Sequence, residues 1–423
     1  MRAMAEDALH VLRAAIESGT LRSLKDLYAA DAVFEGYLPG GVRDASGPRA
    51  IVNELARDID RPARIVSWET TGSHLTLFTL ELGDPPRRMR RGWKLAVRDD
   101  GTISRHWAYA DSLDADTAGM SGARIRRVER PGGAAVYEKW ISRDHDWLMR
   151  ITEDDGREAT LWTTGALANV PAGPVYPVVD VVPGPEGDGW LITTRDMSEH
   201  LFDDEPTIDQ WRVVFDAIEA LHDHFRGVPT EGLCTLENRF EIFSEATCRR
   251  ELGGSDWLPK SNLHGWRVLP TILPDDIREP FLDLVRSPAP LLAALRETES
   301  TLIHGDLRPA NLGIESGRVI ALDWALAAAA PPIVDLAWVA MDVESRDEIQ
   351  QLMRDVARPA VDERQLRLGL LYQACLALPG IGYWVTTAAP DLLDAAVVER
   401  DWWFDRAREG LAALAGARIG ARR

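Results

Sequence analysis

Cysteine is scarce in this sequence. Only Cys234, Cys248 and Cys375 occur in 423 residues, without a CxxC pair and without closely spaced histidines. Such a pattern does not build a zinc site, and so little cysteine is typical of a protein kept in a reducing compartment. We therefore expect a cytoplasmic protein without a structural metal.

Long hydrophobic runs are also missing. The apolar stretch near the N-terminus contains Glu6, Asp7 and Arg13, which predicts an amphipathic helix rather than a signal peptide. The longest later apolar run, at residues 325–341, is interrupted by two prolines and Asp335. The pattern therefore predicts no membrane-spanning segment.

Basic side chains are outnumbered, with 48 against 67 acidic ones and a net charge of −19. Residues 115–423 hold nearly all of this excess, because 32 of their side chains are basic and 50 are acidic. An acidic surface repels phosphate backbones and anionic lipid head groups. We therefore expect neither a nucleic-acid partner nor a membrane partner.

The length and the hydrophobic pattern indicate more than one domain, since 423 residues are too many for one core. Helical patterns at 5–18 and 48–58 precede alternating runs near 63–82 and 92–98, which predicts a helix-covered curved sheet. Periodicity is lost across 111–122. We predict an α+β chain with a first domain at 1–112, a linker at 113–122, a β-rich lobe and hinge at 123–200, and a helical lobe at 201–423.

The segment LIHGDLRPANLGIESGRVIALDW, residues 302–324, contains the residues most suited to chemistry. A predicted hairpin at 311–314 and 318–322 brings Asn311 and Asp323 side by side, because antiparallel pairing joins these strand ends. Amide and carboxylate oxygens suit Mg²⁺ on nucleotide phosphates. Asp306, a few residues upstream, can then accept or orient a hydroxyl proton, which is the arrangement of phosphoryl transfer.

These residues resemble a known family. The signature HGDxxxxN followed by a strand-terminal aspartate is matched by His304, Gly305, Asp306, Asn311 and Asp323. It is the signature of aminoglycoside phosphotransferases, choline kinases and their relatives, which share the protein-kinase-like fold. The resemblance implies Asp306 as catalytic base, Asn311 and Asp323 as Mg²⁺ ligands, His304 as a support of the loop and Arg308 as a charge-balancing neighbour.

Lysine usage singles out a cation for the nucleotide phosphates. Only four of the 48 basic residues are lysines, and Lys139 alone lies in a predicted strand of the β-rich lobe. A partly buried ammonium needs a carboxylate partner, and Glu158 in the next predicted helix offers one. By resemblance these two residues form the lysine–glutamate pair of the family, and the backbone around Asp196 and Met197 binds adenine at the hinge between the lobes.

Three further patterns carry smaller expectations. Asp335 resembles the family's aspartate that braces the catalytic loop, and its local pattern predicts a helix N-cap. His222 and His224 end a predicted helix, so we expect a capping or surface role for them rather than a metal site. The acidic and aromatic segment ERDWWFD, residues 399–405, is a candidate pocket for a cationic ligand.

The first domain resembles the nuclear-transport-factor-2-like or SnoaL-like cone fold through LYAADAVFEGYLPGGVRDASGPRAI, residues 27–51. The resemblance implies a cone that opens onto a pocket, with Tyr28, Asp31, His106 and Asp111 as polar residues that face it. Such a domain in a fusion more often binds, dimerises or senses than catalyses. A homodimer through this domain is the corresponding partner expectation.

Together these patterns predict a small-molecule kinase that transfers the γ-phosphate of ATP, with Mg²⁺, to a hydroxyl of a small molecule. The acidity of residues 115–423 favours a cationic acceptor such as an aminoglycoside or an amino alcohol. Two alternatives stay open: an inactive kinase-fold binding module, and chemistry in the first domain. A protein kinase is disfavoured, because the turn at residues 131–133 is not GxGxxG and Trp324 follows Asp323. The sequence does not distinguish ATP from GTP.

Overall fold

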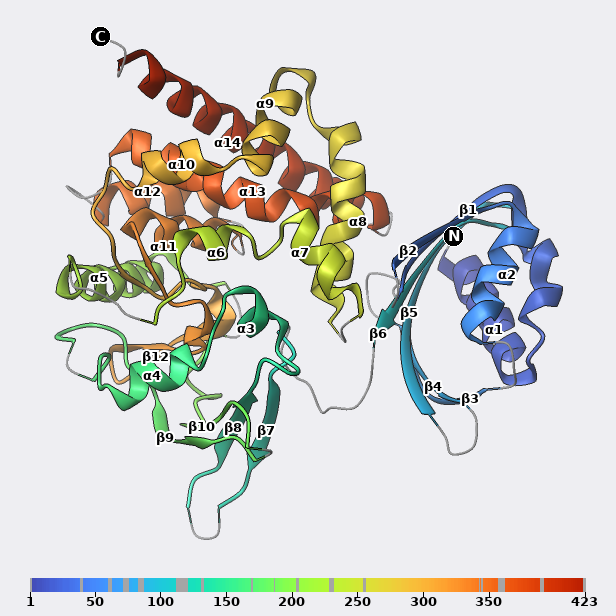
Figure 1. Cartoon of the computed structure of the whole chain (residues 1–423), viewed down its shortest axis with the longest axis horizontal. Coiled ribbons are helices and arrows are strands. Elements are labelled where there is room, and N and C mark those ends of the chain that lie inside the picture. Colours follow the sequence, from blue (N-terminus) through green and yellow to red (C-terminus); the bar gives the residue numbers. More distant parts are fainter. Residues whose placement is uncertain are drawn as a thin grey trace. The chain divides into compact units, whose positions relative to one another are not determined.

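The chain forms two compact units (Figure 1). Unit 1 comprises Met1–Ala115, Cys248–Trp266 and Gly382–Val397, and unit 2 comprises Asp116–Thr247, Arg267–Ile381 and Val398–Arg423. The computed structural model describes residues 2–38, 41–59, 63–70, 76–82, 87–111, 121–130, 133–168, 170–185, 187–202, 205–227, 232–253, 256–341, 343, 345–356, 362–388 and 392–420. Most of the predicted linker, residues 113–120, therefore lies outside the described residues.

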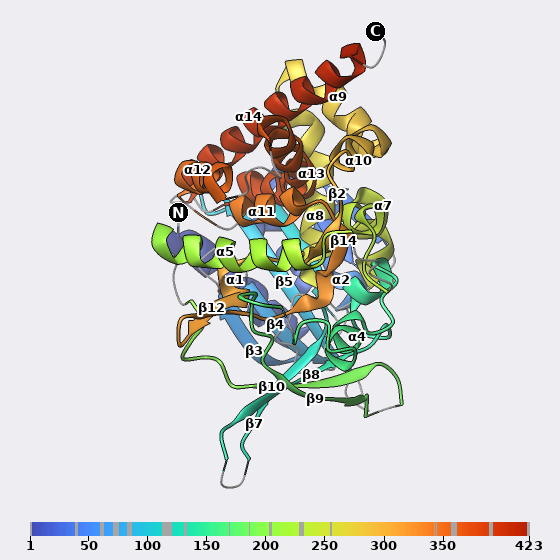
Figure 2. The ribbon, with the colours of Figure 1, turned by 90° about the vertical axis from the view of Figure 1, so that its left-hand side faces the viewer.

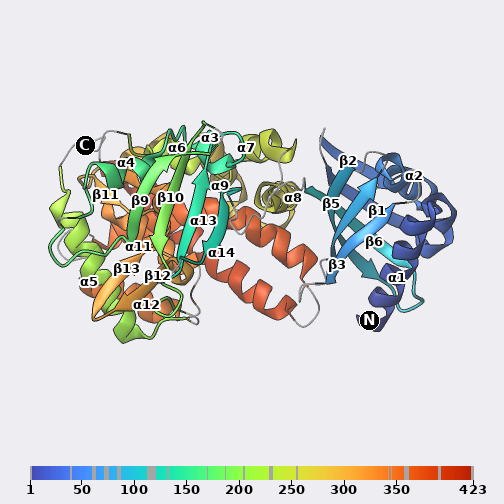
Figure 3. The ribbon, with the colours of Figure 1, turned by 90° about the horizontal axis from the view of Figure 1, so that it is seen from below.

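A six-stranded sheet forms the centre of unit 1, in the order β2-β1-β6-β5-β4-β3. Its strands are β1 (Tyr28–Leu38), β2 (Gly41–Ser46), β3 (Arg64–Thr70), β4 (Thr76–Leu82), β5 (Arg87–Val97) and β6 (Ile103–Asp111). The only parallel neighbours among them are β1 and β6, which bring the start and the end of the unit's sheet together. The helices α1 (Arg2–Ser18) and α2 (Pro48–Asp58) cover one face of the sheet (Figures 1 and 3).

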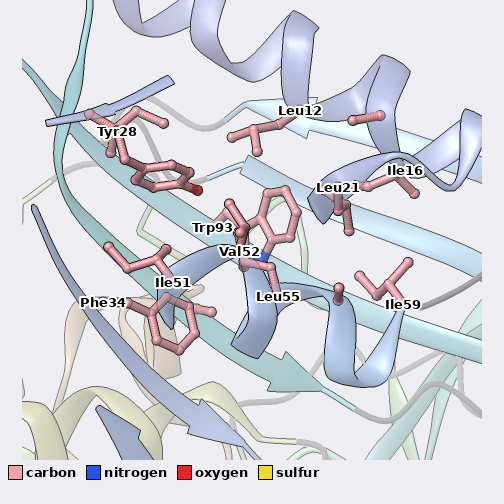
Figure 4. Close-up of a cluster of buried hydrophobic side chains, with 14 of the residues drawn as sticks. Leu12, Ile16, Leu21, Tyr28, Phe34, Ile51, Val52, Leu55, Ile59 and Trp93 are labelled. Carbon is pink, nitrogen blue, oxygen red and sulfur yellow. The ribbon is translucent and has the colours of Figure 1, made fainter. Parts of the chain in front are cut away.

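The interior of unit 1 is filled by apolar side chains (Figure 4). Alternation along β5 points Trp93 inward, and the helical period of α1 and α2 supplies the facing residues. The labelled members of this core are Leu12, Ile16, Leu21, Tyr28, Phe34, Ile51, Val52, Leu55, Ile59 and Trp93. The cone-shaped sheet therefore closes on a packed core.

Unit 2 begins with a small antiparallel sheet in the order β7-β8-β10-β9. Its strands are β7 (Arg124–Val128), β8 (Val136–Ile141), β9 (Val178–Pro183) and β10 (Trp190–Arg195), with the helices α3 (Trp147–Ile151) and α4 (Arg157–Thr163) between β8 and β9. The register pairs Lys139 of β8 with Ile192 of β10. The helix that we predict to hold Glu158 is present as α4.

The rest of unit 2 is mostly helical, and Figure 2 shows these helices above the small sheet. A capping box between Thr207 and Gln210 starts the first of them, as the sequence TIDQ favours. The helices of the chain after the small sheet are α5 (Ile208–His224), α6 (Leu236–Phe240), α7 (Glu245–Arg250), α8 (Trp257–Ile272), α9 (Asp275–Arg286), α10 (Ala289–Leu295), α11 (Pro332–Trp338), α12 (Arg346–Val356), α13 (Glu363–Thr387) and α14 (Leu393–Gly420).

Two short strand pairs lie among these helices. Strand β11 (Thr301–Ile303) pairs with β14 (Ala328–Ala330), and β12 (Leu312–Glu315) pairs with β13 (Arg318–Ala321). Ser316 and Gly317 join β12 and β13 with positive φ angles of 51° and 78°, as a two-residue hairpin turn requires. The predicted hairpin and the predicted α+β fold class are confirmed.

Helix α13 is long and apolar enough to cross a bilayer, and it is the single such helix among the described residues. Within its most apolar window, 78% is buried inside the chain, as in the core helix of a globular protein. Helix α13 also contains a longer apolar segment than residues 325–341. We expected residues 325–341 to be the longest later apolar run.

Candidate active site

The loop between β11 and β12 holds Asp306 between two hydrogen-bond donors. Asn311 Nδ2 lies 2.8 Å from Asp306 Oδ2, and Trp338 Nε1 lies 2.8 Å from Asp306 Oδ1. Asn311 ends the short helical turn η3 (Pro309–Asn311), which places its amide beside the aspartate five residues earlier. Because Nδ2 of Asn311 is engaged by Asp306, its amide oxygen is the group left to face a cation.

The pKa of the Asp306 carboxyl is higher than that of an exposed aspartate. Burial raises the pKa of Asp306 to about 6, and the nearby carboxylate of Asp323 adds to the increase. The guanidinium groups of Arg308 and Arg239 oppose it. Asp306 is therefore ionised at neutral pH but binds a proton more readily than an exposed aspartate does.

Lys139 lies between two carboxylates. Its Nζ is 2.8 Å from Oε2 of Glu158 in α4 and 2.7 Å from Oδ1 of Asp323, which follows β13. Burial alone would lower the pKa of Lys139, but the charges of Asp323 and Glu158 outweigh it and raise this pKa. Burial would raise the pKa of Asp323, yet the Lys139 ammonium lowers it. The cluster is therefore charged at neutral pH.

A pocket of about 270 Å³ opens beside this cluster. Its chemically active members are Lys139, Glu158, Asn311 and Asp323, and most of the others are apolar or aromatic. The full lining is Ile125, Tyr137, Lys139, Glu158, Tyr176, Ile192, Thr194, Arg195, Met197, Ser198, Leu201, Asn311, Leu322 and Asp323. An apolar cavity with a few convergent charged groups at one end is suited to a nucleotide.

The donor set in this pocket fits a divalent cation that is shared with phosphates. The described residues contain no group of three or more histidine, cysteine, aspartate or glutamate side chains that could hold a metal. Asn311 and Asp323 supply only one amide oxygen and one carboxylate, and Mg²⁺ takes its remaining ligands from phosphates and water. These two residues would therefore hold Mg²⁺ together with a nucleotide rather than alone.

His304 and Asp335 hold the loop that carries Asp306. His304 is fully buried, and its Nε2 donates to Leu322 O at 2.9 Å while its Nδ1 accepts from the Asp306 N–H. Asp335 accepts from the backbone N–H groups of His304 and Gly305 at 2.9 and 2.8 Å. His304 thus contacts the loop rather than the pocket.

Two of our local expectations for this region are wrong. Asp335 lies inside the first turn of α11, whose N-cap is Pro331, because its carboxylate is directed to the catalytic loop instead. His222 is buried rather than on the surface, and its Nε2 lies 3.1 Å from Asp335 Oδ2. The helix end of α5 therefore supports the brace.

The two predicted hinge residues differ in their surroundings. Met197 is buried and lines the pocket, whereas Asp196 is not among the lining residues, and its carboxylate accepts from Ser198 and from Arg127 Nε at 2.9 Å. The adenine-binding role of this segment stays a prediction. Arg308 lies in the same loop as Asp306, where its guanidinium opposes the rise in the pKa of Asp306, and its backbone N–H donates to Asp306 O.

Our sequence reasoning missed residues that hold Glu158 in place. Tyr176 OH donates to Glu158 Oε1 at 2.8 Å, so Glu158 uses one oxygen for this tyrosine and the other for Lys139. Arg157, the preceding residue, donates to the carbonyl oxygens of Ala325 and Thr152. Helix α4 is therefore tied to the loop after Asp323. Adjacent buried charges in GREATLW were the available signal, but their partners are distant in sequence.

The candidate ligand residues of the first domain separate into two groups. Tyr28 OH lies 2.8 Å from Nδ1 of His106, and both are buried in the core of unit 1. Asp31 is exposed and pairs with Arg98 at 2.6 Å. The side chain of Asp111 lies outside the described residues. Of the three candidates whose side chains the structure describes, Tyr28 and His106 therefore face the interior and Asp31 does not.

The segment at residues 399–405 does not offer an open cage for a cation. Trp403 is fully buried and donates to Glu399 Oε1 at 2.7 Å, while Glu399 also pairs with Arg346. The guanidinium groups of Arg346 and Arg406 lie 5.0 and 5.2 Å from the ring centroid of Trp402. Arginines of the chain itself occupy the acidic and aromatic groups of this candidate pocket.

The family comparison agrees with this geometry. The model of the phosphotransferase enzyme family matches residues 131–368, which is more than half of the chain. The chain therefore belongs to the phosphotransferase enzyme family, and this membership supports a small-molecule phosphotransferase. A comparison with curated proteins finds no match.

Solved structures similar to the chain include kinases and a cone-type protein. The choline kinase LicA from Streptococcus pneumoniae has a TM-score of 0.41 and 14% identity, and the match covers 72% of this chain and 94% of LicA. A thermostable variant of an aminoglycoside phosphotransferase, solved with AMP-PNP and hygromycin B, has a TM-score of 0.40 and 18% identity, with 71% and 93% covered. An NTF2-like protein of unknown function from Mesorhizobium loti matches the N-terminal part, with a TM-score of 0.22, 15% identity and coverages of 26% and 93%.

Proposed function

We propose that the protein is an ATP-dependent, Mg²⁺-dependent kinase that phosphorylates a hydroxyl group of a small molecule. The observation that carries this proposal is the arrangement of Lys139, Asn311 and Asp323 on one pocket, with Asp306 hydrogen-bonded to Asn311. A phosphate cation, two Mg²⁺ ligands and a base are the parts that phosphoryl transfer requires. The family membership supports the same reaction class.

Each residue of the proposed site has its own role in the transfer of the phosphoryl group. When bound, ATP with Mg²⁺ supplies the phosphoryl group and neutralises part of its charge. Lys139 adds a positive charge against the phosphates, and Glu158 fixes its position. Asp306 orients the acceptor hydroxyl and takes its proton, since a pKa of about 6 leaves it ionised at neutral pH.

We infer a cationic acceptor, such as an amino alcohol or an aminoglycoside. The support is electrostatic, because residues 115–423 carry a net charge of −18. A negative field concentrates cations near a cleft and speeds their association. A cytoplasmic setting belongs to the same proposal, and the three cysteines, all of them buried free thiols, support it.

A nucleotide-binding experiment tests the first part of the proposal. Thermal unfolding is measured with Mg–ATP, with ATP plus EDTA and with Mg–GTP, since a ligand at about one hundred times its Kd stabilises a protein by about 2.7 kcal/mol. We expect a Mg²⁺-dependent shift that Lys139→Ala abolishes. Lys25→Ala is the matched control, because Lys25 is exposed in unit 1. A wild-type protein without any nucleotide shift would contradict the proposal.

An acceptor screen tests the second part. ADP release from ATP is followed with choline, ethanolamine, hygromycin B and uncharged sugars as acceptors, and the phosphorylated product is identified by mass spectrometry. We expect turnover with cationic alcohols above the rate with water. Turnover with uncharged sugars alone would reject the cationic acceptor but keep the kinase. Nucleotide binding without turnover on any acceptor would favour the binding module.

A further inference from the structure

We propose that Trp338 is a positioning residue for the Asp306 base, and that Arg239 holds Trp338 in place. Trp338 and Asn311 each donate one N–H to the Asp306 carboxylate, on different oxygens, and so define its orientation. This role rests on the proposed function, since it assigns a task to a residue that acts through the base.

The hydrogen bond between Trp338 and Asp306 is shielded from solvent, and Trp338 is always its donor. Trp338 ends α11 and is 6% exposed, and its Nε1 lies 2.8 Å from Asp306 Oδ1. An indole N–H donates but never accepts a hydrogen bond. Trp338 can therefore orient the carboxylate through the whole reaction without taking its proton.

Arg239 joins the indole ring to the backbone of the catalytic loop. It lies in α6 and is fully buried, with its Cζ 4.3 Å from the ring centroid of Trp338. Its Nη2 donates to the carbonyl oxygen of Gly305, the residue before the base. Its Nε and Nη1 have no hydrogen-bond partner among the described residues. The Arg239 guanidinium thus contacts both the Trp338 ring and the Gly305 carbonyl.

Two donors on two oxygens restrict the base in a way that one donor does not. Rotation of an aspartate carboxylate about its Cβ–Cγ bond is otherwise soft. The paired N–H groups fix this rotation, and each oxygen keeps a lone pair for the acceptor hydroxyl. Loss of one donor would misplace the accepting lone pair, and a misplaced catalytic group costs up to about 100-fold in rate. Trp338 does not line the nucleotide pocket, so nucleotide affinity should not change.

The kinetic test compares two buried tryptophans. Trp338→Phe keeps an aromatic ring for Arg239 but removes the N–H. Trp403→Phe is the matched control, because Trp403 is also buried and also donates its indole N–H to a carboxylate, that of Glu399. With the acceptor that the wild type uses, we expect kcat to fall between about 10- and 100-fold in Trp338→Phe. The KM for ATP should stay within about twofold, and Trp403→Phe should keep the wild-type kcat.

A spectroscopic test reads the contact without turnover. Protein labelled with ¹⁵N-tryptophan shows one indole N–H resonance for each ordered tryptophan, and the two Phe variants assign those of Trp338 and Trp403. In Asp306→Asn we expect the Trp338 resonance to move, since a charged acceptor becomes neutral. The Trp403 resonance should stay in place.

The outcomes separate this proposal from the proposed function. A wild-type kcat in Trp338→Phe, or an unmoved Trp338 resonance in Asp306→Asn, would overturn the positioning role while the kinase stands. An equal loss of kcat in both Phe variants would overturn it as well, because it would reflect general destabilisation. A wild-type protein that turns over no acceptor would instead reject the proposed function, and the positioning role with it.

Discussion

Unit 1 and unit 2 both bury polar side chains, but they do so in opposite ways. In unit 1 the Tyr28–His106 pair lies among apolar rings, with Trp93 4.9 Å and Phe34 5.5 Å from the His106 ring centroid. In unit 2 the Lys139, Glu158 and Asp323 cluster lines an open pocket. Burial of polar groups alone therefore does not identify a functional site.

The protonation states separate the two regions further. Burial lowers the pKa of His106 to about 3 and raises that of Tyr28, so the pair is neutral at pH 7. In unit 2 the carboxylates outweigh burial and keep Lys139 charged. A neutral pair inside a packed core needs no ligand. A charged cluster beside a cavity, in contrast, is suited to bind a charged ligand.

The largest expected effect is on turnover in Asp306→Asn. This change keeps the size of the side chain but removes the group that accepts a proton, so kcat should fall by about 10²- to 10⁴-fold. Nucleotide binding should persist, since Asp306 does not line the pocket. Steady-state kinetics and the Mg–ATP thermal shift measure both. Normal turnover in this variant would reject Asp306 as the base.

Asp323→Asn should have the next largest effect, on Mg–ATP binding. The variant loses a cation ligand and one of the two carboxylates that hold Lys139. Asp323 is half-buried, and a hydrogen bond to a charged group contributes about 1.5–3 kcal/mol, which corresponds to a loss of affinity on the order of 10- to 100-fold. Calorimetry with Mg–ATP and with ATP plus EDTA measures it. Equal losses under both conditions would argue against a metal role.

Acid should destabilise the protein through His106. The pKa of His106 is lowered in the folded state. Unfolded chains therefore bind a proton at this histidine below about pH 6.5, whereas folded chains bind it only below about pH 3. The contribution to stability is full above pH 6.5 and is lost as the pH falls towards 3, by about 3 kcal/mol at pH 4. Denaturant unfolding at pH 7 and pH 4 should show a smaller difference for His106→Gln than for wild type. Identical differences would contradict a neutral buried His106.

Tyr176→Phe should weaken nucleotide binding by about tenfold. The change removes the hydroxyl that occupies Oε1 of Glu158, and a hydrogen bond to a charged group contributes about 1.5–3 kcal/mol, part of which is needed to hold Lys139. Isothermal titration with Mg–ATP gives the affinity. An unchanged affinity would show that Lys139 alone positions Glu158.

Tyr28→Phe should have the smallest effect and should leave turnover unchanged. It removes the hydroxyl beside His106, which costs about 1–3 kcal/mol of stability because a buried ring nitrogen loses its partner. Denaturant unfolding and the kinase assay measure the two effects. A loss of turnover comparable to that of Tyr176→Phe would break the contrast between the units and indicate a functional role for the core of unit 1.

Much of the candidate site follows from short-range sequence. Asn311 and Asp323 meet through one hairpin, whose turn at Ser316–Gly317 is encoded locally. Lys139 stands out because lysine is so scarce, and its partner Glu158 lies only 19 residues further on. Such local signals can be recognised without knowledge of the fold, because turn preferences depend on a few neighbouring residues and composition is counted from the sequence.

Other features depend on contacts between distant segments. His222 reaches Asp335 across 113 residues, and Arg239 reaches Gly305 across 66. In the sequence His222 resembles any histidine at a helix end, and Trp338 resembles any core tryptophan. Nothing local distinguishes them, because their roles come from the partners that packing supplies.

The family and the members of the candidate site could be recognised from the order of residues, since HGDLRPAN and the following hairpin place Asp306, Asn311 and Asp323 within one short stretch. The groups that orient those residues became known from the packing of the folded chain. Hydrogen bonds donated by Trp338 and Tyr176 join segments that are separated along the chain. Such contacts arise when helices and strands pack, so the order of residues alone does not disclose them.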